Sequence, residues 1–201
     1  MPTSPPPDLL NAQACLIDAL ALSLHIRDPS TGYHCDRVGR LVECLTRYCG
    51  LALEESRLIT LAARFHDIGK IGIPDSVLLS PGSLNTAERA LMCEHSVLGE
   101  QIFLATGRSD AQLIARLIRA HHEAFDGSGY PDHLHGEDIP LGARILTVAD
   151  TYDAMTSLRP YHSALTADAA LRYLEDQSGR LVDPYILHAF QKMYRENPQL
   201  R

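Results

Sequence analysis

Histidine and aspartate are the residues whose types and spacing could do chemistry in this chain. The sequence has ten histidines, and several fall on apolar stripes that should face a protein core. One histidine on such a face is usually satisfied by hydrogen bonds, but several with carboxylates need more partners, because an unpaired buried polar group costs roughly 1–3 kcal/mol. Metal ions bind imidazole nitrogen and neutralise carboxylates. The candidate ligands are His34, His66, Asp67, His95, His121, His122 and Asp150.

The number of candidate ligands predicts two metal ions. Seven ligands exceed what one tetrahedral ion needs, and they suit two divalent ions that share a bridging carboxylate. Asp67 is the natural bridge because it adjoins one histidine and is central in the set. Two metals roughly 3.5–4 Å apart form a phosphoryl-transfer centre that turns a bridging water into hydroxide. The sequence contains no Walker A, GxSxG or HExxH motif, which favours hydrolysis.

The elements that must position these residues are predicted to be helices. Apolar residues recur at three- and four-residue steps, for example at Leu9, Ala12, Leu16, Leu20 and Leu24. Capping boxes are predicted at Asn85 with Glu88 and at Ser109 with Gln112, opening helices of roughly 87–106 and 110–122. Asp183 before Pro184 predicts the start of the last helix. We expect an all-α, single bundle-like domain of about seven helices, because few segments alternate at period two.

Composition and charge restrict the class of protein. Hydrophobic residues make up 45% and charged residues 21%, as in soluble globular proteins. The net charge of −7 argues against binding to duplex nucleic acid. The five cysteines form no CxxC pair, which predicts a reducing cytoplasm. No signal peptide or membrane span is evident. Residues 1–7 are expected to be a disordered proline-rich arm, followed by one domain over 8–201.

Two segments then carry a specific resemblance. Residues 66–75 read HDIGKIGIPD and residues 121–131 read HHEAFDGSGYP. Supporting segments are HCDRVGR at 34–40, EHSVLGE at 94–100, GEDIPLGARILTVADTYDAMTS at 136–157 and RPY at 159–161. In this order they resemble the HD-GYP subgroup of the HD phosphohydrolase superfamily, over roughly residues 25–190.

The resemblance implies an HD-domain fold with a di-metal or tri-metal centre that hydrolyses cyclic di-GMP to linear pGpG, sometimes onward to GMP. One metal would be held by His34, His66, Asp67 and Asp150, and the second by Asp67, His95, His121 and His122. Iron and manganese are the expected ions. Members with three metals have a glutamate where this chain has Ser30, so two metals are expected.

The resemblance also assigns residues around the metals. Asp67 and Lys70 are the catalytic candidates, with Lys70 near the scissile phosphate or metal water. Arg159 would grip a substrate phosphate, and His162 stands where the family often has lysine, so it would bind phosphate more weakly near pH 7. The GYP loop would either shape the rim of the cleft or a partner-binding surface, or orient His121 and His122. Asp126 in this loop could keep a histidine in its metal-binding tautomer. Its residues are Asp126, Gly127, Ser128, Gly129, Tyr130 and Pro131.

Other functions stay open at this point. A cyclic GMP-AMP phosphodiesterase would carry the same motifs. A low-activity signalling adaptor would bind cyclic dinucleotide or a diguanylate cyclase (GGDEF) partner through the GYP loop. Inactive members usually lose a metal ligand, and all seven are present here, which favours the enzyme. Oligomeric state and activating signal are not predicted.

Overall fold

The computed structural model describes the backbone of residues 7–157 and 164–197, with side chains from residue 15 onward. Within these ranges the chain is helical, and its only β pairing is an isolated bridge between Ser178 and Val182. The all-α prediction is confirmed. The elements are α1 (Pro7–Arg27), α2 (Pro29–Tyr48), α3 (Leu53–Phe65), η1 (Ile68–Gly72), α4 (Asp75–Leu78), α5 (Thr86–Cys93), α6 (His95–Leu104), α7 (Ala111–Ala120), η2 (Gly136–Asp138), α8 (Leu141–Thr156), α9 (Ala167–Asp176) and α10 (Pro184–Glu196).

Three predictions concern segments outside these ranges. Residues 1–6 of the expected arm, Arg159 and His162 lie outside the described residues, while Pro7 already begins α1. Among the helices that are described, none is long and apolar enough to cross a membrane.

The predicted capping boxes have different outcomes. The Asn85 side chain accepts a hydrogen bond from the Glu88 amide at 3.0 Å, and the Glu88 carboxylate accepts one from the Asn85 amide at 2.9 Å, so this box is confirmed. The box at Ser109 is wrong. Helix α7 starts after Asp110, whose carboxylate pairs with Arg108 at 2.8 Å instead of capping a backbone amide.

The predicted helix over 87–106 is two helices. α5 ends at Cys93 and α6 begins at His95, with Glu94 between them. In one continuous helix Leu91 would share a face with His95, four residues on, but Leu91 is 39% exposed, whereas His95 is 1% exposed. Because of such breaks, the described chain has more helices than the seven expected, and they are shorter. The break at Glu94 places His95 at the start of α6.

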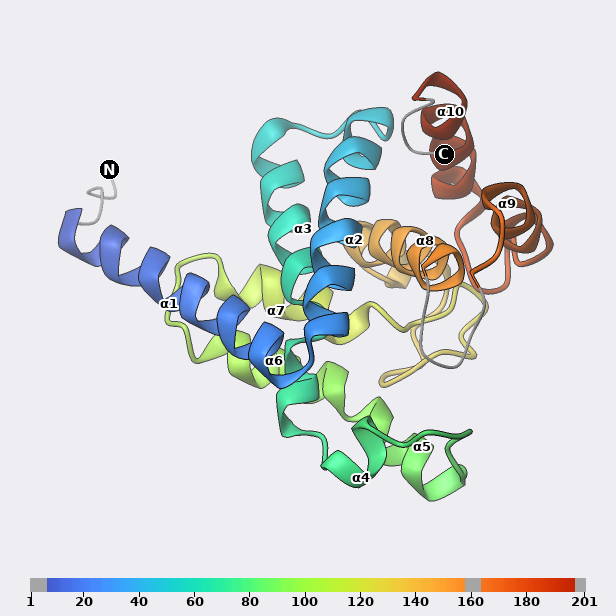
Figure 1. Ribbon diagram of the computed structural model, residues 1–201. Helices are drawn as coiled ribbons and strands as arrows, with labels where there is room; N and C mark the ends of the chain where they lie inside the picture. The colour runs from blue at the N-terminus through green and yellow to red at the C-terminus, as the bar shows by residue number, and fades with distance from the viewer. Residues whose placement is uncertain (1–6, 158–163, 198–201) are drawn as a thin grey trace.

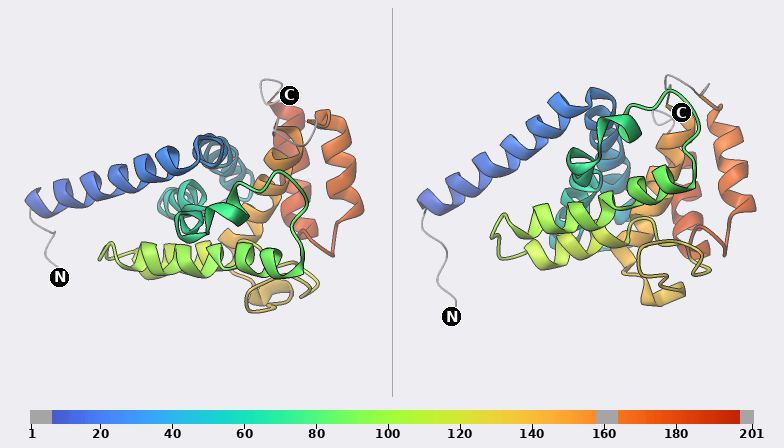
Figure 2. Two further views of the ribbon diagram at one scale, coloured as in Figure 1. Left: turned by 60° about the horizontal axis from the view of Figure 1, so that its bottom comes forward. Right: turned by 90° about the horizontal axis from the view of Figure 1, so that it is seen from below.

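Two large apolar clusters form most of the core, and α3 contributes to both, while a small third cluster joins Ala120, Ile139 and Ala143. The first joins α2, α3, α8, α9 and α10 through residues such as Val42, Ile145 and Phe190. The second joins α1, α3, η1, α6 and α7 around Phe65 and Phe103, and α2 reaches it through Cys35. Figure 1 shows α2 and α3 side by side at the centre, and Figure 2 shows α6 and α7 running together along one side.

Helix α1 packs on this core largely with the predicted face. Leu24 is 2% exposed and Leu20 packs against the same cluster, but Leu16 is 39% exposed and its neighbour Ile17 is buried instead. Figure 1 shows α1 leading away from the body toward its N-terminal end, and its later turns meet the core from Ile17 onward.

Candidate metal centre

All seven predicted ligands come together where the two core clusters meet. His34 comes from α2, His66 and Asp67 follow α3, His95 opens α6, and Asp150 lies on α8, while His121 and His122 follow α7. They form two groups whose ligand atoms lie within 4.8 Å of one another: Asp67, His95, His121 and His122 in one, and His34, His66 and Asp150 in the other. Helix ends thus supply five of the seven side chains.

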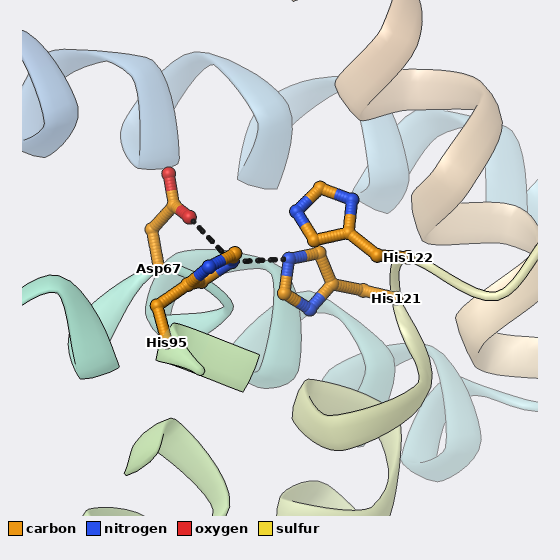
Figure 3. Close-up of side chains that lie close together, drawn as sticks. All are labelled: Asp67, His95, His121 and His122. Atoms are coloured by element: carbon orange, nitrogen blue, oxygen red, sulfur yellow. Dashed lines mark hydrogen bonds and ion pairs between the residues drawn. The ribbon is translucent and has the colours of Figure 1, made fainter. Parts of the chain in front are cut away.

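Asp67 lies between the two groups. Its Oδ1 is 3.3 Å from His95 Nε2, while its Oδ2 is 3.5 Å from His66 Nε2 and 4.0 Å from His34 Nε2. Figure 3 shows the Asp67 carboxylate pointing at the His95 ring, which in turn faces His121. Lys70 Nζ is 2.6 Å from Asp67 Oδ2. Burial raises the pKa of Asp67, but Lys70 and the histidines outweigh it and hold this pKa well below its usual value.

His34 is held between two carboxylates of α8. Its Nε2 is 2.9 Å from Asp150 Oδ1 and its Nδ1 is 2.7 Å from Asp153 Oδ2. Arg37 and Ser157 bind the Asp153 carboxylate from the other side, at 2.8 to 3.1 Å. Burial lowers the pKa of His34, but hydrogen bonds to Asp150 and Asp153 outweigh it and raise the pKa to about 9.

Asp153 was missed in the sequence. Its one signal is the three-residue step from Asp150, which places both carboxylates on one side of α8. By holding Nδ1 of His34, it does what Asp126 was expected to do. The Asp126 carboxylate is exposed and accepts from the Ser128 amide at 2.9 Å, so it caps its own turn and has no hydrogen bond to a histidine of the described residues.

Three other histidines are held by backbone carbonyls. In each case Nδ1 bonds the carbonyl oxygen three residues earlier; because a carbonyl only accepts, Nδ1 carries the proton and Nε2 is bare in the neutral ring. The pairs are His66 with Ala63 at 2.7 Å, His95 with Met92 at 2.7 Å and His121 with Ile118 at 2.5 Å.

This arrangement leaves two bare nitrogens facing each other. His95 Nε2 is 3.2 Å from His121 Nε2 (Figure 3). Burial lowers the pKa of His95 and, together with the neighbouring histidines, holds that of His121 well below its ordinary value, so both rings are neutral. Two buried lone pairs that point at each other lack a donor, and a cation between them satisfies both. The donor set therefore fits metal ions.

The GYP loop lies against the last ligand of α7. The Tyr130 amide donates to the His122 carbonyl at 3.1 Å, and the two rings are 4.8 Å apart. Gly127 has a φ of +83°, which favours glycine. Burial lowers the pKa of His122 to about 3. A second residue missed in the sequence, Glu123, is buried directly after the histidine pair.

Comparison with known proteins places the chain in a family. A family model described as HD domain matches residues 15–186. The chain belongs to the HD domain family. Over 173 residues this HD domain is 45% identical to the cyclic di-GMP phosphodiesterase response regulator RpfG of Xanthomonas campestris, with 86% of this chain and 46% of that protein covered. It is 37% identical to the 3'3'-cGAMP-specific phosphodiesterase 2 of Vibrio cholerae, covering 90% of this chain and 34% of that protein.

These relatives confirm the HD-GYP resemblance seen in the motifs. The HD domain spans 46% of the length of RpfG and 34% of the length of the Vibrio phosphodiesterase. Among solved structures, a cyclic GMP-AMP specific phosphodiesterase of V. cholerae, V-cGAP3, aligns with a TM-score of 0.68 at 20% identity, covering 94% of this chain and 49% of that one. This similarity confirms the HD-domain fold.

Proposed function

We propose that this HD domain hydrolyses the cyclic dinucleotide cyclic di-GMP to linear pGpG, with cleavage of pGpG to GMP as a second step of the same chemistry. The observation that carries the proposal is the pair of neutral imidazoles, His95 and His121, whose Nε2 atoms face each other at 3.2 Å beside Asp67. The relatives named as cyclic dinucleotide phosphodiesterases supply the substrate class.

The ligand groups suggest how two divalent ions, iron or manganese, would be held. His34, His66 and Asp150 would hold one ion, and His95, His121 and His122 the other, with one oxygen of Asp67 facing each group. When bound, such ions supply a hydroxide nucleophile at neutral pH and offset charge on the phosphate. Mixed imidazole and carboxylate ligands suit both metals.

The chain's own residues would position the substrate. Lys70 keeps a positive charge beside Asp67, because the pKa of its ammonium is raised by that carboxylate despite burial. We assign Lys70 to the scissile phosphate, where a compact cation offsets negative charge. Arg159 would hold a substrate phosphate through its two-pronged guanidinium, and His162 would add a weaker contact.

A second substrate is cyclic GMP-AMP. It is favoured by the Vibrio relative named as specific for 3'3'-cGAMP, at 37% identity over 90% of this chain. The two substrates differ in one base, so hydrolysis at the shared phosphodiester uses the same residues. An adaptor that binds a diguanylate cyclase is the alternative from another class, and it predicts binding without turnover.

The decisive experiment is anaerobic turnover by protein loaded separately with iron(II) and manganese(II). Cyclic di-GMP and 3'3'-cGAMP are supplied in parallel, and products are resolved by chromatography. We expect metal-dependent linear dinucleotide, with cyclic di-GMP the better substrate. Absence of product from both substrates, with two ions per chain measured by elemental analysis, would contradict the enzyme and favour the adaptor.

Asp67→Ala tests the shared carboxylate directly. We expect turnover to fall to background and the metal content to fall below two ions per chain, because each group loses an oxygen ligand. Far-UV circular dichroism should keep its helical signal, since apolar clusters hold the helices. Retained turnover in Asp67→Ala would contradict the proposed metal centre.

A further inference from the structure

Glu123 is a buried carboxylate whose contacts lead to a loop. Its side chain is 1% exposed. One oxygen accepts from the Asp132 amide at 2.7 Å, and the other accepts from the Leu134 amide at 3.0 Å. A buried carboxylate is costly unless it is hydrogen-bonded, and two amides from one short segment meet that need. Glu123 therefore ties the segment that follows the GYP sequence to the end of α7.

The tied segment is packed onto His122. Besides the hydrogen bond from the Tyr130 amide to the His122 carbonyl, Gly129 lies so close to the backbone that a Cβ there would collide with Ala124 N and His122 O. The Tyr130 ring lies over the His122 ring at 4.8 Å with 33° between the planes. On its other sides, His122 meets the rings of His121 at 3.9 Å and His95 at 4.9 Å.

His122 needs this support more than the other histidines do. His66, His95 and His121 each bond a carbonyl through Nδ1, and His34 bonds Asp153. Within the described part of the chain, no such hydrogen bond to the His122 ring occurs. Ring packing therefore takes the place of that hydrogen bond in orienting the His122 ring, and the Tyr130 ring forms one face of that packing.

We infer that Glu123 is a positioning residue: it anchors the loop that seats Tyr130 on His122, and so fixes His122 as a metal ligand. The inference rests on the proposed metal pair and extends it to a residue that touches neither ion. It also gives the GYP loop of this chain a use in assembling the centre.

The test is the manganese affinity and stoichiometry of purified variants, measured by calorimetry and elemental analysis. Glu123→Gln keeps the shape but removes the charge that both amides bind. We expect one of the two ions to bind about 10–100-fold more weakly, as when groups that orient a ligand are lost, while the other keeps wild-type affinity. Wild-type affinity for both ions in Glu123→Gln would overturn the inference.

Asp183→Asn is the matched control. Asp183 is also buried, caps α10 through the Tyr185 amide at 2.8 Å and pairs with Arg144, and neither of these partners is a proposed metal ligand. The Asp183→Asn substitution should lower the melting temperature and leave both manganese ions bound. The same pattern in Glu123→Gln would show a merely structural role and overturn the inference. A wild-type protein that binds fewer than two ions would instead overturn the proposed metal pair.

Two tyrosine variants test the route through the ring. Tyr130→Phe keeps the ring over His122, so both manganese affinities should match wild type. Tyr130→Ala removes the ring and should weaken the same ion as Glu123→Gln does, by about 10–100-fold. Equal affinities in the two tyrosine variants would overturn the inference even if Glu123 variants failed to fold.

Discussion

At the scale of single residues, the histidines obtain their orientation in two ways that depend on helix position. Ala63, Met92 and Ile118 lie in the last turns of α3, α5 and α7, where carbonyls lack the usual partner four residues on. Those carbonyls accept from His66, His95 and His121. His34 lies inside α2, where carbonyls are already engaged, so a side-chain carboxylate, Asp153, takes this role.

Asp153→Asn tests this role. The amide loses the charge that holds both Arg37 and His34, so the ring should become a weaker and less fixed ligand. We expect the affinity of one metal ion to fall about 10–100-fold, measured by competition with a chelator. Asp126→Asn is the control, because that exposed carboxylate binds only its own turn, and it should keep wild-type affinity. Unchanged affinity in Asp153→Asn would refute the role.

At the scale of elements, sequence periodicity predicted the helices that carry ligands better than it predicted their ends. Leu91 and Leu98 are seven residues apart and therefore fit one continuous face, so the break at Glu94 was not visible. The same limit explains the missed residues. Asp153 meets a histidine from a distant helix and Glu123 meets loop amides, and neither contact leaves a periodic pattern in the sequence.

The contact between η1 and α6 also belongs to this scale, and Gly69→Ala tests it. A Cβ at Gly69 would collide with the His95 carbonyl oxygen and lie 2.5 Å from the Gly99 nitrogen, so α6 must move and carry His95 with it. Overpacking of this kind costs about 1–3 kcal/mol, which lowers the melting temperature by roughly 2–4 °C per kcal/mol for a chain of this size. Metal affinity should fall in parallel.

Gly82→Ala is the control for this substitution. A Cβ at Gly82 meets nothing within 4 Å. The exposed site should change stability by less than about 0.5 kcal/mol. Equal melting temperatures for the Gly69 and Gly82 variants in thermal denaturation would show that the two elements are not packed as closely as the structure has them.

At the scale of the whole molecule, the two ligand groups come from the two halves of the core. His34 and Asp150 lie on α2 and α8 of the first apolar cluster. His95 and His121 lie on α6 or directly after α7, which belong to the second cluster. Helix α3 contributes to both clusters, as α2 does through Cys35, and α3 leads into Asp67, which faces both ligand groups. Metal binding should therefore stabilise the contact between the halves as well as create a reaction centre.

Thermal denaturation with and without metal tests this coupling. An ion that binds only the folded chain stabilises it by about 2.7 kcal/mol at 100 times its dissociation constant, which corresponds to roughly 5–11 °C in melting temperature. We expect at least this rise for manganese-loaded protein over protein treated with a chelator. Asp67→Ala should lose most of it, because Asp67 faces both ligand groups. Identical melting curves for loaded and chelator-treated protein, with two ions bound by elemental analysis, would mean that the ions bind the unfolded chain equally well, and the centre would then contribute nothing to joining the halves.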